Sequence, residues 1–155
     1  MKFLYKALIL FAFLSLISPN ISYAKETLTL TELLDSISES KGKQVVLINF
    51  YASWCTPCRR EIPAFIEVRN EFDKNSLKMI ALNLDDSPEI MKSFNKKMNI
   101  NYDTFHDSGE LAQFYMVQGI PFTIIYGKDG NAVLAETGLM NKKDLVDAIN
   151  YGLTK

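Results

Sequence analysis

The stretch Trp54-Cys55-Thr56-Pro57-Cys58 comes shortly after the apolar run Val45-Val46-Leu47-Ile48-Asn49-Phe50-Tyr51 and holds both cysteines of the chain. Two thiols at this spacing close a small disulfide ring with little backbone movement, so they can cycle between dithiol and disulfide. A Cys-x-x-Cys that ends a strand and opens a helix is typical of a redox site. A structural metal site is the alternative, but it needs further ligands, and the chain has one histidine and no third cysteine. The stretch therefore predicts redox chemistry without a metal or a cofactor.

The first 24 residues have the order of a secretory signal peptide. Lys2 and Lys6 give a positive start, Ala7–Ile17 is apolar, and Ser22-Tyr23-Ala24 offers small residues for cleavage near Ala24. The alternative is an uncleaved N-terminal membrane anchor. The apolar stretch Ala7–Ile17 is shorter than the roughly 18 residues that a spanning helix requires, which disfavours an anchor.

Residues 25–155 are predicted to form one domain, because they contain no internal repeat, low-complexity tract or linker. The signal peptide predicts a periplasmic or otherwise extracytoplasmic location, where disulfides persist. The whole chain has 17 basic and 18 acidic residues, and loss of residues 1–24 leaves it mildly acidic. Nucleic acid is not expected as a partner, because phosphate contacts require basic patches.

The hydrophobic pattern predicts alternating strands and helices. Gln44–Tyr51 is β-branched and apolar without alternation, which is typical of a strand buried on both faces of a sheet. Further strands are predicted over Thr27–Leu30, Leu77–Leu84, Tyr102–Phe105, Phe122–Tyr126 and Ala132–Glu136. Helices are predicted over Thr31–Ser40, from the cysteine pair to about Asn75, over Ser87–Asn99 and Gly109–Tyr115, and from Asn141 onward. This order indicates an α/β fold whose sheet ends in a hairpin and a helix.

From Thr27 to Leu153 the chain resembles the TlpA/ResA-like exported branch of the thioredoxin superfamily. The resemblance rests on the cysteine motif after Val45–Phe50, and on Glu61-Ile62-Pro63, Asp85-Asp86, Gly119-Ile120-Pro121 and Lys128-Asp129-Gly130. It implies a thioredoxin fold, with a central mixed β-sheet flanked by helices on both faces. It also implies thiol-disulfide oxidoreductase activity.

Cys55 is the expected nucleophile and Cys58 the resolving cysteine. At a helix start, unpaired backbone N–H groups and the helix dipole favour the thiolate of Cys55. Thr56 and Pro57 are expected to tune the reduction potential, and they match neither the Gly-Pro of thioredoxin nor the Pro-His of its strongly oxidising relatives. A permanent structural disulfide is the alternative, although so short a ring restrains little of the unfolded chain.

Three residues are expected to bind substrate. The resemblance places Pro121 as the cis-proline opposite the cysteine pair, and it implies that the backbone of Ile120 pairs with an extended client segment. Trp54 is expected to lie beside the thiols and present an apolar surface to partners, with plain core packing as the alternative.

Asn49 and Glu61 distinguish the chain from thioredoxin itself. Asn49 stands where thioredoxin has a buried Asp that moves the proton of the resolving thiol, and an amide cannot titrate. The resemblance implies that Glu61, three residues after Cys58, takes this part. A partly buried carboxylate has a raised pKa and is suited to accept a proton. The alternative is an ordinary solvated helix acid.

Two further features are given structural interpretations. His106 is interpreted as a surface or strand-end residue, and Asp85-Asp86 as the end of a strand and the start of a loop.

The resulting hypothesis is an exported reductase of protein disulfides. The resemblance implies periplasmic clients, including apocytochrome c during cytochrome c maturation, and a membrane thiol-transporting protein as electron donor. A disulfide-forming oxidant using the same residues is the main alternative. A thiol peroxidase would need Thr where Ala52 stands, and a non-catalytic binding module remains a further alternative.

Overall fold

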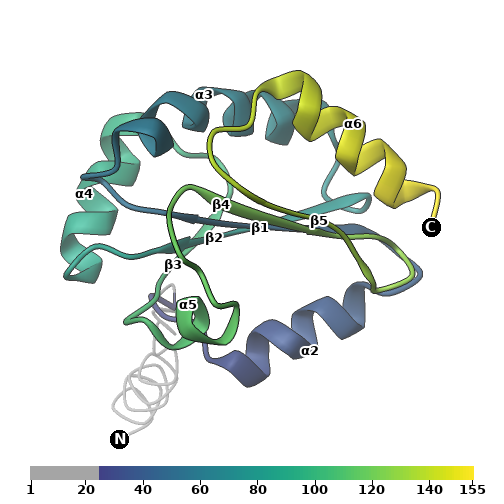
Figure 1. The fold of residues 1–155 in the computed structure, drawn as a ribbon, viewed down its shortest axis with the longest axis horizontal. Helices are drawn as coiled ribbons and strands as arrows, with labels where there is room; N and C mark the ends of the chain where they lie inside the picture. Colours follow the sequence, from purple (N-terminus) through teal and green to yellow (C-terminus); the bar gives the residue numbers. More distant parts are fainter. Residues whose placement is uncertain (1–24) are drawn as a thin grey trace, which may run out of the picture.

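The computed structural model describes residues 25–155, so the signal peptide predicted over residues 1–24 lies outside the described part (Figure 1). The elements follow one another in the order α2 (Leu30–Ser40), β1 (Val45–Tyr51), α3 (Thr56–Glu71), β2 (Leu77–Asn83), α4 (Pro88–Met98), β3 (Asp103–His106), α5 (Glu110–Phe114), β4 (Phe122–Tyr126), β5 (Ala132–Thr137) and α6 (Lys142–Leu153). Apart from the first predicted strand, this order confirms the predicted alternation, with a closing hairpin and helix.

The five strands form one mixed sheet in the order β3-β2-β1-β4-β5. Strand β1 is parallel to β2 and antiparallel to β4, and β2 is parallel to β3. All seven residues of β1 are buried, as its mostly apolar sequence without alternation predicts. The central position of β1 places the segment that follows it, with the two cysteines, at the middle of one edge of the sheet.

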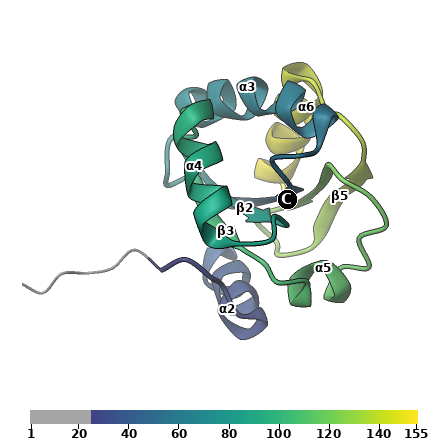
Figure 2. The same ribbon diagram turned by 90° about the vertical axis from the view of Figure 1, so that its left-hand side faces the viewer.

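Helices cover both faces of the sheet, which confirms the predicted fold class. Figure 1 shows α3 and α6 on one face and α2 and α5 on the other, and Figure 2 shows α4 beside α3. The residues of β1 alternate between the two cores: Val45 and Leu47 pack with α3 and α6, whereas Val46 and Ile48 pack with α2 and α5. A strand with two apolar faces therefore joins two hydrophobic cores.

The predicted strand over Thr27–Leu30 is wrong. Thr27 makes only an isolated bridge to His106, and Thr29 is already the N-cap of α2. Thr29 Oγ1 accepts a hydrogen bond from the backbone N–H of Glu32, and the Glu32 carboxylate accepts one from the backbone N–H of Thr29. This capping box satisfies two free donors at once, so the helix begins earlier than the predicted cap at Thr31.

Helix α3 ends at Glu71, earlier than predicted, and Arg69 stabilises the chain that leaves it. The buried guanidinium of Arg69 donates hydrogen bonds to the carbonyl oxygens of Phe72 and Leu77, the latter at 2.8 Å.

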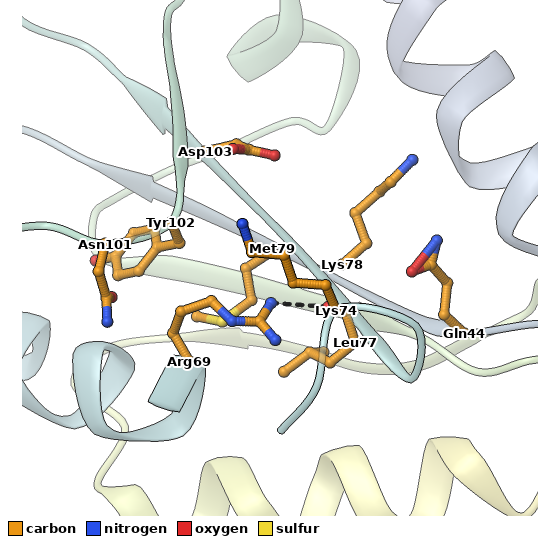
Figure 3. A pocket seen from close by; sticks show the side chains of 9 residues that line it. All are labelled: Gln44, Arg69, Lys74, Leu77, Lys78, Met79, Asn101, Tyr102 and Asp103. Carbon is orange, nitrogen blue, oxygen red and sulfur yellow. Dashed lines mark hydrogen bonds between the residues drawn. The ribbon is translucent and has the colours of Figure 1, made fainter. Parts of the chain in front are cut away.

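A cavity of about 220 Å³ lies beside the start of β2 (Figure 3). Its lining residues are Gln44, Arg69, Lys74, Leu77, Lys78, Met79, Asn101, Tyr102 and Asp103. Since β1 and β2 begin here and the cysteines follow the end of β1, this cavity lies at the opposite end of the sheet from them.

The C-terminal part follows its sequence signals. Residues 128–131 connect β4 and β5 as predicted, with Gly130 in the left-handed region at φ 81°. Asn141 caps α6 by accepting a hydrogen bond from the backbone N–H of Asp144. Within residues 25–155, no helix has the length and apolar character needed to cross a membrane.

Candidate functional site

The pairing of β1 with β4 brings two distant segments together. Phe50, near the end of β1, is the register partner of Phe122, at the start of β4. Because the strands are antiparallel, the segment after β1 and the segment before β4 meet at the same edge of the sheet. The first holds Cys55 and the second holds Pro121.

The two cysteines form a disulfide at the start of α3, with an S–S distance of 2.05 Å. Cys55 is the N-cap of this helix, and its sulfur accepts a hydrogen bond from the backbone N–H of Cys58 at 3.2 Å. Cys55 is 4% exposed and Cys58 is fully buried. The sulfur of Cys55 is therefore the more accessible one, at the positive end of a 16-residue helix.

The Ile120–Pro121 peptide bond is cis, as the resemblance implies. The carbonyl oxygen of Ile120 lies 3.6 Å from the sulfur of Cys55. The proline segment thus faces the cysteine pair. The backbone of Ile120 therefore lies directly beside the Cys55 sulfur.

Exposed side chains surround the disulfide. Trp54 is 64% exposed, so core packing does not explain it. Thr56 and Pro57 are exposed in the first turn of α3, where the Thr56 hydroxyl accepts a hydrogen bond from Arg59 at 3.3 Å. An open hollow of about 430 Å³ adjoins the segment before Cys55, and its lining residues are Ser53, Glu89, Ile90, Ser93, Phe94 and Lys97.

Glu61 lies one turn after Cys58 on α3 and is only 1% exposed. This is deeper than the partial burial predicted, and it excludes the solvated alternative. Its Oε1 accepts a hydrogen bond from Asn49 Nδ2 at 3.0 Å, and its Oε2 accepts one from the backbone N–H of Met140 at 3.2 Å. Burial raises the pKa of Glu61 to about 7, because the loss of water disfavours the charged form more than the two hydrogen bonds favour it.

Asn49 orients this carboxyl group. Its Nδ2 also donates to Thr123 Oγ1 at 3.0 Å, and Asn49 and Thr123 are register partners on β1 and β4. Asn49 and Glu61 are identified from the sequence, whereas Thr123 and the backbone N–H of Met140 are not. No local sequence signal marks Thr123 or Met140, because both reach the site only through the packing of distant segments.

Two structural interpretations need correction or refinement. His106 is interpreted from the sequence as a surface or strand-end residue. It does lie at the end of β3, but it is buried and not at the surface. Asp85 and Asp86 follow β2 as expected, yet only Asp86 is exposed, whereas Asp85 is 4% exposed and hydrogen-bonded.

The raised pKa of Glu61 predicts a pH-dependent stability. Between pH 4.5 and about 7, folded Glu61 keeps a proton that unfolded Glu61 releases, so its contribution to the free energy of unfolding falls by about 3 kcal/mol as the pH rises. Glu61→Gln removes this pH-dependent contribution. The free energy of unfolding of the oxidised variant, minus that of oxidised wild type, should therefore rise by about 3 kcal/mol between pH 4.5 and pH 8. Urea denaturation at the two pH values measures this difference.

The exposed Glu67 on the same helix provides the control. Glu67→Gln should leave the pH dependence close to that of wild type. A stability difference between Glu61→Gln and wild type that stays constant with pH would contradict the raised pKa.

Known proteins are similar to this chain in sequence and in fold. The sequence model described as the AhpC/TSA family matches residues 23–135. Thiol-disulfide oxidoreductase ResA of Bacillus subtilis is 29% identical over 115 residues, which cover 74% of this chain and 64% of ResA. Thioredoxin-like protein YneN of the same organism is 30% identical over 120 residues, covering 76% of this chain and 69% of YneN.

Two solved structures have the same architecture. StoA from Bacillus subtilis superposes with a TM-score of 0.63 at 27% identity, over 70% of this chain and 83% of StoA. A protein from Chlorobium tepidum described as a putative thiol:disulfide interchange protein DsbE superposes with a TM-score of 0.69 at 26% identity, over 76% of this chain and 84% of that protein.

The resemblance inferred from the motifs is thus confirmed. The chain spans slightly less than two thirds of ResA, while the family model covers most of residues 25–155. The chain belongs to the AhpC/TSA family, and within the thioredoxin superfamily it is similar to the ResA-type thiol-disulfide oxidoreductases.

Proposed function

We propose that the protein is an exported thiol-disulfide oxidoreductase that reduces disulfides in other proteins. The observation that carries this proposal is the Cys55–Cys58 disulfide, which caps α3 and faces the carbonyl oxygen of Ile120. The similarity to ResA, named a thiol-disulfide oxidoreductase, supports the same class of reaction.

The reaction begins with the reduced pair. The thiolate of Cys55 attacks one sulfur of a client disulfide, which forms a mixed disulfide and releases the other client sulfur as a thiolate. The thiolate of Cys58 then attacks the sulfur of Cys55. This step restores the Cys55–Cys58 disulfide and releases the second client thiolate. Two electrons pass from the protein to the client, and solvent protonates the client thiolates.

Glu61 is the proton acceptor for Cys58 in this proposal. Both side chains are buried, one helical turn apart on α3, so bulk water has poor access to the Cys58 thiol. A carboxyl group with a pKa of about 7 matches a neutral operating pH, where a general base works best. Asn49 holds the carboxyl group in place without competing for the proton, because an amide does not titrate.

Client binding uses the surface around Cys55. The carbonyl oxygen of Ile120 beside the redox sulfur is suited to pair with an extended peptide, which favours clients of varied sequence. The exposed ring of Trp54 adds apolar contact area next to the disulfide.

The signal peptide predicted over residues 1–24 supports a location outside the cytoplasm, periplasmic where that compartment exists. A reductase in such a compartment needs electrons from elsewhere. We therefore include a membrane thiol-transporting protein as electron donor. Client proteins with oxidised cysteines are the acceptors, and apocytochrome c is one candidate among them.

The reduction potential tests the direction of electron flow. Equilibration with glutathione should give a value near that of thioredoxin, about −270 mV, for a reductase. A value near −120 mV would instead identify a disulfide-forming oxidant. Cys55→Ser should show no such redox equilibrium within the chain, and it serves as the control.

The Cys58→Ser variant should trap clients. Without the resolving thiol, the mixed disulfide on Cys55 persists and is visible as a dithiothreitol-sensitive adduct on non-reducing gels. Cys55→Ser should yield far fewer adducts. Equal trapping by both variants would mean that Cys55 is not the attacking residue.

Replacement of Glu61 tests its part in the resolving step. In wild type, the decay of a glutathione mixed disulfide should accelerate as the pH rises through about 7, the pKa of Glu61. In Glu61→Gln this step should be about 100-fold slower at pH 7, a typical contribution of a general base. Rapid acid quenching and mass spectrometry measure the decay, with Glu67→Gln as the control. A Glu61→Gln rate equal to that of wild type would exclude the role.

A further inference from the structure

Asp85 is a buried carboxylate that the proposed reaction does not use. It lies two residues after β2 and is 4% exposed. Its Oδ1 accepts two hydrogen bonds from Ser53, one from the backbone N–H at 2.9 Å and one from the hydroxyl at 2.8 Å. A buried carboxylate is costly unless such donors surround it, so this arrangement indicates a specific role.

Asp85 is itself fixed from two other directions. Its Oδ2 accepts a hydrogen bond from Asn83 Nδ2, and its backbone N–H donates to Asn83 Oδ1, both at 3.0 Å. The carbonyl oxygen of Asp85 lies 2.7 Å from His106 Nε2. Since a carbonyl only accepts, Nε2 carries the hydrogen. Asn83 at the end of β2 thus holds the carboxylate of Asp85, and His106 at the end of β3 holds its backbone carbonyl.

The segment that Asp85 holds leads straight to the redox pair. Ser53 lies between the end of β1 and Cys55, and the backbone N–H of Cys55 donates to the carbonyl oxygen of Ala52 at 3.2 Å. Cys55 has an extended backbone (φ −80°, ψ 107°), and in this conformation its sulfur accepts a hydrogen bond from the N–H of Cys58. Loss of the hydrogen bonds that fix Ser53 would free the segment before Cys55, and with it the sulfur that caps the helix.

We propose that Asp85 is a positioning residue of the redox site, which fixes Ser53 and thereby holds the Cys55 sulfur at the start of α3. This inference rests on the proposed function. Asp86, the next residue, is exposed and serves no such role.

A positioning role of Asp85 and a purely electrostatic role predict opposite effects on the stability of the Cys55 thiolate when Asp85 is replaced. If the hold on Ser53 matters, its loss frees the Cys55 sulfur from the helix start, and the thiolate becomes less stable. If only the negative charge of Asp85 mattered, its removal would favour a nearby thiolate. The direction of the change therefore separates the two explanations.

The experiment measures alkylation of Cys55 by iodoacetamide in the reduced protein at pH 7, with mass spectrometry to identify the modified cysteine. Asp85→Ala should react about tenfold more slowly than wild type. Its equilibrium with glutathione should shift about tenfold toward the disulfide, which corresponds to about 30 mV. Asp86→Ala, the matched control, should behave as wild type in both measurements.

An exchange variant provides the rescue. Asn83→Asp combined with Asp85→Asn keeps the charge and restores the same set of donors and acceptors, with the amide oxygen at position 85 facing Ser53. It should react within about twofold of wild type. A loss of reactivity as large as that of Asp85→Ala would overturn the proposal, because the hydrogen bonds to Ser53 would then not explain the effect.

Asp85→Ala that reacts as fast as wild type, or faster, also overturns the proposal. If circular dichroism shows that Asp85→Ala does not fold, Ser53→Ala tests the proposal instead. Its Cys55 should be alkylated about threefold more slowly than that of wild type. An unchanged rate in Ser53→Ala then overturns the proposal. Failure of wild type to exchange with glutathione would count against the proposed function, whereas alkylation still tests the positioning role.

Discussion

The antiparallel pairing of β1 with β4 is the constraint on which the rest of the site depends. It sets Phe50 opposite Phe122 and Asn49 opposite Thr123. The first pair brings the segment of Cys55 against the cis-proline segment, and the second completes the hydrogen bonds that orient Glu61. A register shift of one residue would turn Asn49 to the other face of the sheet and separate it from Glu61. Backbone pairing therefore controls both the position of the cis-proline segment and the hydrogen bonds of Glu61, the proposed proton acceptor.

Two buried carboxyl groups lie near the redox pair, and their surroundings suit different tasks. Glu61 receives two hydrogen bonds, which do not offset the loss of water, and burial raises its pKa to about 7. It is thus suited to exchange a proton. Asp85 receives three hydrogen bonds through its carboxylate, two of them from Ser53. Such a carboxylate is suited to hold a backbone segment in place.

The sequence predicted most of the fold because its strong signals are local. The largely apolar run of β1, the helix that starts at Asn141 and the hairpin that contains Lys128-Asp129-Gly130 all appear in the structure. One error occurred where two local signals compete. Thr27–Leu30 alternates like a strand, but the capping box of Thr29 and Glu32 is the stronger interaction, so the helix begins there.

The sequence by itself determined the redox pair and its place at a helix start, because these depend on residues close together in the chain. It also determined the family resemblance, because each motif that carries it is a short run of neighbouring residues. Only the tertiary structure decided which acidic residues are buried. The resemblance marks Glu61 by its place after Cys58, but the sequence does not show its burial, and Asp85 looks no different in sequence from the exposed Asp86. Burial and hydrogen-bond partners distinguish them, and both depend on how distant segments pack. The sequence thus identifies the reacting sulfur atoms, while the packed sheet and helices decide which groups surround them.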